Sequence, residues 1–111
     1  MSRDKGKRGE REFAALCKEF GYDAHRTAQH KGKTGQAADV EGLPGLHVEV
    51  KRTERFSLYD SVAQAKSDCA ASGGSKIPIV AHRKNDCAWV VVMEAKDFFK
   101  IYAEWEPAQE V

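Results

Sequence analysis

The segment LHVEVKR at residues 46–52 constrains the fold of this chain more than any other feature. Apolar and polar residues alternate along it, and residues two apart on a β-strand point to the same face of a sheet. The segment is therefore predicted to be a strand with one face in a hydrophobic core. Its other face brings Glu49 and Lys51 together, with side-chain origins roughly 6–7 Å apart from the strand rise.

Two segments with helical periodicity flank this strand. In residues 7–20 apolar side chains recur at i, i+3, i+4 and i+7, and residues 58–71 carry a similar stripe. Further strands are predicted at residues 22–28, 37–41, 77–82 and 88–93, and a last short helix at residues 95–102. The order is helix, three strands, helix, two strands, helix (αβββαββα). It predicts an α/β fold in which helices pack on a mixed central sheet.

The length of 111 residues fits one domain with one core. We expect residues 1–111 to form a single unit, with its core in about residues 5–100 and a frayed tail at residues 103–111. The three cysteines form no CxxC pair, which indicates reduced thiols and a cytoplasmic protein. No apolar run approaches the roughly 20 residues that cross a bilayer, so no membrane association is expected.

Charge is distributed unevenly although the net charge is only +1. Residues 1–34 carry nine Lys or Arg against five Asp or Glu, a balance of +4. Residues 35–93 carry seven of each, and residues 94–111 carry two Lys against five acids, a balance of −3. A basic N-terminal third can face phosphates. An uneven solvated surface explains the same distribution equally well.

The candidate site combines Glu49 and Lys51 with Asp39. The turn Leu43-Pro44-Gly45 is predicted to fold the Asp39 segment back beside the strand of Glu49, so that two carboxylates converge. A hard divalent cation such as Mg²⁺ binds one or two carboxylates and keeps several waters. A neighbouring amine can orient an attacking water or stabilise charge on a phosphate. These parts suit metal-dependent hydrolysis of phosphodiester bonds.

The same residues resemble a known family. Asp39 followed by Val-Glu-Val-Lys resembles the PD-(D/E)XK nuclease motif, and KGKRGEREFAALCKEFGY, His25-Arg26, ADVEG and HVEVK together resemble the archaeal-type Holliday junction resolvases and their phage relatives. The resemblance covers roughly residues 5–100. It implies a restriction-endonuclease-like fold and a structure-selective DNA endonuclease that requires Mg²⁺, for which Mn²⁺ substitutes. It further implies that the cytoplasm in question is that of a prokaryote or of a phage-infected host. It also implies a role in DNA recombination and repair, cleavage of four-way junctions to 5′-phosphate and 3′-hydroxyl ends, and a homodimer matched to the two-fold symmetry of the junction.

The resemblance also implies individual roles. Asp39, Glu49 and the backbone carbonyl of Val50 correspond to metal ligands, Lys51 to the catalytic lysine, and Glu10 to a helical acid that assists the metal. Helical geometry alone does not decide between Glu10 and Glu12. The residues expected to contact DNA are Arg11, Arg26, Lys31, Lys33 and Arg52. Ala38 stands where the motif has its proline, and the loop at residues 27–36 is longer than in the archaeal enzymes, which leaves the preferred DNA structure open.

Several alternatives remain at this point. Glu49 and Lys51 alone would form an ordinary ion pair across an exposed strand face. Arg11 and Arg26 are equally well explained as surface charges, and Lys31 and Lys33 as parts of a flexible loop. His47 is expected to line the cleft rather than to touch DNA. Other functions that fit are a replication-repair or restriction-like nuclease acting on other DNA structures, and a DNA-binding module without catalysis.

Overall fold

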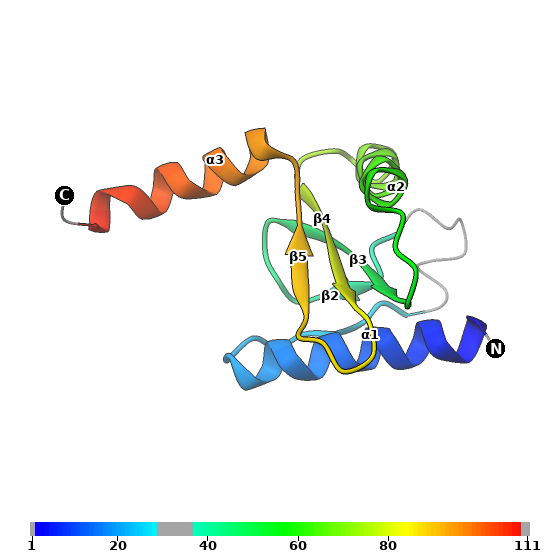
Figure 1. Ribbon diagram of the computed structural model, residues 1–111. Helices are drawn as coiled ribbons and strands as arrows, with labels where there is room; N and C mark the ends of the chain where they lie inside the picture. Colours follow the sequence, from blue (N-terminus) through cyan, green and yellow to red (C-terminus); the bar gives the residue numbers. More distant parts are fainter. Residues whose placement is uncertain (1, 29–36, 110–111) are drawn as a thin grey trace.

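The protein is described by a computed structural model that covers residues 2–28 and 37–109, with side chains from residue 6 onward. The order of elements predicted from the sequence is confirmed (Figure 1). The elements are α1 (Ser2–Glu19), β1 (His25–Arg26), β2 (Val40–Glu41), β3 (Leu46–Arg52), α2 (Leu58–Ala71), β4 (Ile77–Arg83), β5 (Val90–Val92), α3 (Ala95–Trp105) and the 3₁₀ turn η1 (Glu106–Ala108).

The strands form one mixed sheet in the order β1-β2-β3-β4-β5. The pairs β1/β2, β2/β3 and β4/β5 are antiparallel, whereas β3 and β4 run parallel with Glu49 opposite Val80. Parallel neighbours need a crossover connection, and α2 supplies it. The sheet is therefore of the mixed α/β type that the sequence pattern predicts.

Helices α1 and α2 cover opposite faces of the central strand β3. A β-carbon at Gly9 of α1 would contact the side chains of Val50 and Arg52, whereas Glu49 lies near Cys69 of α2, where burial raises the pKa of the thiol and the charge of Glu49 contributes a little. Alternate side chains of β3 therefore face α1 on one side of the sheet and α2 on the other, as the sequence pattern predicts. The buried core lies on the α1 side and comprises Phe13, Ala14, Cys17, Ala24, Val40, Val48, Val50, Ile79 and Ala81.

Gly9 sets how closely α1 approaches the sheet. A β-carbon built at this position would lie 2.5 Å from the β-carbon of Arg52, a separation that packed atoms do not tolerate. The glycine therefore permits α1 to lie directly on β3. This close approach brings the helical acids Glu10 and Glu12 to the sheet.

The observed elements differ from the sequence pattern at three places. Helix α1 begins at Ser2 rather than near residue 7. The strand expected at residues 22–28 is only the two-residue β1, and before it the chain turns locally, with the N–H of Ala24 donating to the carbonyl of Tyr22 at 2.9 Å. The frayed tail expected from residue 103 is replaced, as far as residue 109, by the end of α3 and by η1. None of the described helices combines the length and apolar character that crossing a membrane requires.

Candidate active site

Asp39 is fixed against β3 on both sides of Glu49. Its backbone N–H donates to the carbonyl of Val48 at 2.8 Å, and its Oδ2 accepts from the N–H of Val50 at 2.8 Å. The backbone carbonyl of Asp39 accepts from the N–H of Thr27 at 3.0 Å. Continuing the β2/β3 register beyond the Val40–Val48 pair makes Asp39 level with Glu49. The predicted convergence of the two carboxylate residues is therefore present in the fold.

The electrostatic surroundings of Asp39 are unfavourable for a second negative charge. The pKa of Asp39 is raised from its ordinary value of 3.8 to about 7, chiefly by burial and next by the charge of Glu49, with a smaller contribution from Glu10, while the Val50 N–H and Lys51 act in the opposite direction. Like charges that share a site disfavour ionisation of both. A divalent cation between these carboxylates would remove the repulsion, so the donor set fits a hard metal ion.

Glu10 reaches this group from α1 and is held by a partner. The Nε of Arg26 donates to Oε1 of Glu10 at 2.8 Å, and both side chains are largely shielded from solvent. The contact ties β1 to α1 at the edge of the site. Two residues predicted separately, one as a metal assistant and one as a DNA contact, are therefore bonded to each other.

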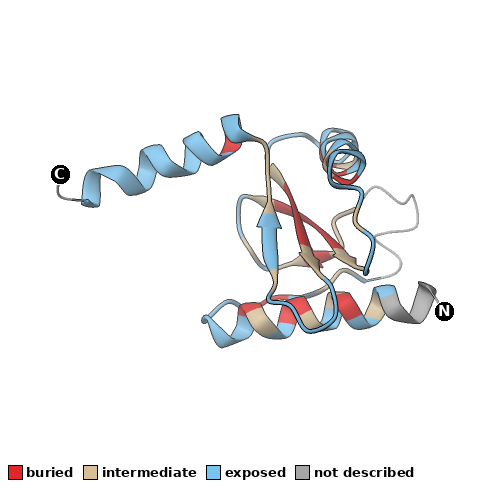
Figure 2. Cartoon of the chain, in the orientation of Figure 1, coloured by how far each residue is buried: buried red, intermediate tan, exposed pale blue. Residues whose placement is uncertain are grey.

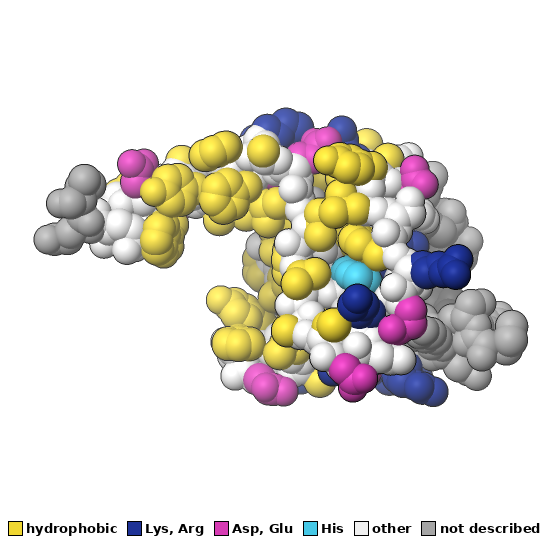
Figure 3. Space-filling model, in the orientation of Figure 1, with side chains coloured by type: hydrophobic (Ala, Val, Ile, Leu, Met, Phe, Trp, Pro, Cys, Tyr) yellow, Lys and Arg dark blue, Asp and Glu magenta, His cyan; other side chains and the backbone are white. Residues whose placement is uncertain are grey.

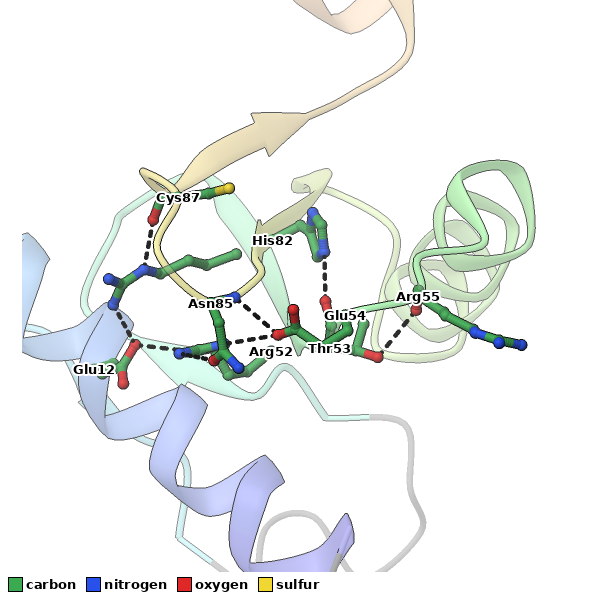
Figure 4. A network of polar contacts seen from close by, with 9 residues as sticks. Glu12, Arg52, Thr53, Glu54, Arg55, His82, Asn85 and Cys87 are labelled. Carbon is green, nitrogen blue, oxygen red and sulfur yellow. Dashed lines mark hydrogen bonds and ion pairs between the residues drawn. The ribbon is translucent and has the colours of Figure 1, made fainter.

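Glu12 belongs to a different network (Figure 4). Its Oε1 accepts from Nε of Arg52 at 3.2 Å and from Nη1 of Arg83 at 3.0 Å, and Arg52 also lies 3.7 Å from Glu54 and donates to Asn85 at 3.0 Å. These contacts join α1, the end of β3 and the β4–β5 connection. The structure thus separates the two helical acids, because Glu10 influences Asp39 whereas Glu12 is neutralised by arginines.

Glu49 has a partner that the sequence analysis did not identify. Nε2 of His47 lies 2.8 Å from Oε2 of Glu49 in hydrogen-bond contact, and the two residues are only 3% and 6% exposed. Because β3 alternates, both side chains lie on the same face of the strand. His47 supports Glu49 from within the protein, and in this arrangement it is not open to DNA. The sequence signal for this contact was that His47 and Glu49 are two residues apart on one predicted strand.

Lys51 completes the face that carries Glu49. It is half-buried, and among the described residues it has no ion-pair partner. It lies near enough to Asp39 to lower the pKa of that carboxyl group. The amine therefore lies beside the carboxylates and, within the described residues, is not engaged in a salt bridge.

The residues expected to contact DNA have different surroundings. Arg11 is exposed on α1, whereas Arg26 and Arg52 are engaged in the ion pairs described above. Lys31 and Lys33 lie outside the described residues. Their contact with DNA stays a prediction for each of these positions.

The hydrogen bonds show which carboxylate oxygens are free to bind a metal ion. Asp39 uses Oδ2 for Val50, and Glu49 uses Oε2 for His47, so within the described part of the chain Oδ1 and Oε1 have no hydrogen-bond partner. No three His, Cys, Asp or Glu side chains in that part gather closely enough to hold an ion by themselves. Two carboxylates and water are nevertheless a usual environment for Mg²⁺. The residues fit such an ion as an incompletely filled, open site.

A cavity of about 460 Å³ lies beside this group rather than on it. Its lining includes Ala38, Leu43, His47, Cys69 and Lys76, and excludes Asp39, Glu49 and Lys51. The cavity is therefore lined by neighbours of the reactive side chains and not by those side chains themselves.

An aspartate level with a Glu-x-Lys strand on a mixed α/β sheet defines the PD-(D/E)XK class of nucleases. Over residues 1–111 the chain matches the family described as "Phage putative PDDEXK endonuclease", and it belongs to that family. Its structure is similar to that of Hjc from Archaeoglobus fulgidus, a Holliday junction resolvase from an archaeal hyperthermophile. The TM-score is 0.58 and the sequences are 25% identical, over 80% of this chain and 72% of the other. No curated protein matches the sequence.

Proposed function

We propose that this protein is a metal-dependent DNA endonuclease that uses Mg²⁺, with Mn²⁺ as a substitute, and cuts branched DNA such as four-way junctions. The observation that carries the proposal is the convergence of Asp39 with Glu49, next to the amine of Lys51, which has no ion-pair partner among the described residues. Family membership supports the nuclease activity, and the similarity to a Holliday junction resolvase supports the substrate.

Each residue has a defined task in this proposal. Asp39, Glu49 and the backbone carbonyl of Val50 hold the metal ion, which supplies water activation and charge neutralisation when bound. Glu10 assists from α1, oriented by its bond to Arg26. Lys51 orients the attacking water or stabilises the negative charge that develops on the phosphate. Hydrolysis leaves a 5′-phosphate and a 3′-hydroxyl end.

The basic N-terminal third supports binding to the DNA backbone. Arg11 is exposed there and available to a phosphate, and Lys31 and Lys33 are proposed as further contacts. Arg26 and Arg52 would have to share their charge with Glu10 and Glu12. A four-way junction is two-fold symmetric and needs two matched cuts, so we propose a homodimer that acts in the cytosol.

Catalytic assignment is tested by cleavage and binding measured in parallel. We expect Asp39→Asn and Lys51→Ala to lower the rate of Mg²⁺-dependent cleavage at least about 100-fold, because each removes transition-state stabilisation, while DNA binding at low salt persists. Lys18→Ala is the matched control, since Lys18 is exposed at the far end of α1. Unchanged cleavage by both site variants would show that the site is assigned wrongly.

Substrate choice is tested with a four-way junction, a flap and a plain duplex of the same sequence. Faster cleavage of the junction is the expected result. Equal rates on all three would favour a repair or restriction-like nuclease instead. If the wild-type protein cuts none of them with Mg²⁺ or Mn²⁺ but still binds, a DNA-binding module without catalysis is the better description. Binding should weaken steeply as salt increases.

A further inference from the structure

Helix α3 extends away from the body of the protein and exposes an apolar surface. In Figure 1 it projects on the side opposite the N-terminal end of α1, and Figure 2 shows it exposed along almost its whole length. We define the α3 face as Phe98, Phe99, Ile101, Tyr102 and Trp105. These residues are 48%, 60%, 40%, 37% and 55% exposed. Apolar side chains follow this arm in the space-filling view (Figure 3).

The α3 face has the regular pattern of a helix that packs against another element. Phe98, Ile101, Tyr102 and Trp105 recur at i, i+3, i+4 and i+7, which places them on one stripe. Phe98 stacks on Tyr102 with centroids 5.9 Å apart, and Tyr102 lies 5.7 Å from Trp105. The aromatic rings thus form an ordered row. An amphipathic helix with such a stripe is stable in water only when the stripe is covered.

Charge indicates what kind of molecule covers this face. Residues 94–111 carry two Lys against five acids, a balance of −3, which disfavours both DNA and the anionic surface of a membrane. In the first half of α3, Lys96 and Lys100 lie 3.4 and 3.5 Å from Asp97, so their charges are largely balanced within the chain, whereas Glu104 and Glu106 leave the other end acidic. An antiparallel arrangement of two such helices keeps the two acidic ends apart and aligns the helix dipoles favourably.

The area is also sufficient for a second copy. An aromatic side chain buries 150–250 Å², so the four half-exposed rings of the α3 face provide roughly 400 Å² per protomer. Ile101 adds to this value. Two copies together reach roughly 1,000 Å², the lower limit for a specific interface.

We propose that the α3 face is the surface on which two copies of this chain associate, with the two α3 helices antiparallel across a two-fold axis. The inference rests on the proposed homodimer and specifies its contact. It also places the interface on the side opposite the N-terminal end of α1, so the basic end of that helix remains open in both copies (Figure 1).

Sedimentation velocity of the full chain without DNA or metal tests the surface. The wild-type protein should be dimeric at micromolar concentration, and the double variant Phe98→Glu/Trp105→Glu should raise the dimer dissociation constant at least about 30-fold. Both side chains are exposed, so the far-ultraviolet circular dichroism should not change. Tyr59→Glu is the matched control, because Tyr59 is 85% exposed on α2. A monomeric wild type, or a variant as dimeric as the control, would overturn the proposal.

Cross-linking tests the antiparallel arrangement in a Cys87→Ser background, which removes the exposed native thiol. Ile101 lies near the middle of the stripe, so Ile101→Cys should form an intermolecular disulfide. Phe98→Cys should not, because antiparallel pairing separates the two copies of residue 98 by about 10 Å along the axis. Cross-linking at both positions, at Phe98 alone or at neither would refute this geometry. These measurements do not involve cleavage, so their failure is distinct from failure of the nuclease assignment.

Discussion

Asp39→Asn should make the metal-free protein more stable while abolishing the activity proposed for it. In the folded protein the pKa of Asp39 rises from 3.8 to about 7, chiefly through burial and the charge of Glu49. The folded state therefore holds the proton more tightly than the unfolded chain does. The stability from this group is complete below pH about 4 and is lost as the pH rises through about 7.

The structure sets the size of this effect. The difference between a pKa of 3.8 and one of about 7 corresponds to at most about 4 kcal/mol of unfolding free energy at pH 7 and above. Partial access of solvent and rearrangement of Glu49 reduce this value, so we expect about 1–3 kcal/mol. Asparagine keeps an oxygen that accepts the Val50 N–H bond, so the substitution removes the charge and retains the contact.

Urea unfolding in EDTA at pH 5, 6, 7 and 8 measures this difference. The advantage of Asp39→Asn over the wild type should grow with pH, and Mg²⁺ should then stabilise the wild type but not the variant. Asp23→Asn is a matched control, since Asp23 is exposed and its free energy of unfolding should not separate from the wild type. A variant that is less stable than the wild type at pH 8, or a difference that does not change with pH, would refute the reasoning.

Substitutions at three further positions test the buried partner of Glu49 and the glycines that follow β2. His47→Leu should lower the apparent Mg²⁺ affinity in cleavage at least about 10-fold, because Glu49 loses its buried partner, and His47→Gln should restore part of it; equal metal dependence of all three proteins would contradict a role in holding Glu49. Gly42→Ala should lower the free energy of unfolding by more than about 2 kcal/mol, since its β-carbon would collide with the backbone of Asp23. Gly45→Ala, at φ +86° with open space around it, should cost only about 1 kcal/mol in the same thermal or urea unfolding experiment.

Local sequence patterns were sufficient to predict the elements whose burial on one face those patterns already express. Residues 46–52 and 58–71 are the strand β3 and the helix α2 at the predicted bounds, because alternation and helical periodicity already express burial on one face. The extent of β1 did not follow, since it depends on pairing with β2, a segment that lies further along the chain. The end of α3 was predicted too early, because the acidic residues of the tail indicated fraying from residue 103. In the structure the apolar stripe and the helix continue to Trp105.

The features of the site likewise fall into those that local sequence predicts and those that depend on tertiary packing. The convergence of Asp39 and Glu49 followed from one turn and one strand register, both of which are local in sequence. The ion pair between Glu10 and Arg26 did not follow, because it joins two elements whose approach depends on Gly9 and on the packing of α1 against β3. The choice between Glu10 and Glu12 needed the same information. Side-chain partnerships across layers are set by packing, and no periodicity in the sequence encodes them.

The shortness of β2 explains how the Asp39 carboxylate can be held in position and still have an oxygen available to a cation. If β2 continued before Val40, the N–H of Val50 would bond to the carbonyl of residue 38 in an ordinary antiparallel ladder. Instead the side chain of Asp39 accepts that bond, so one carboxylate oxygen replaces the missing strand. The other oxygen is left without a protein partner in the described residues, beside the charge of Glu49. The interrupted ladder therefore gives Asp39 a rigid position and at the same time leaves an unbalanced charge that a cation can relieve.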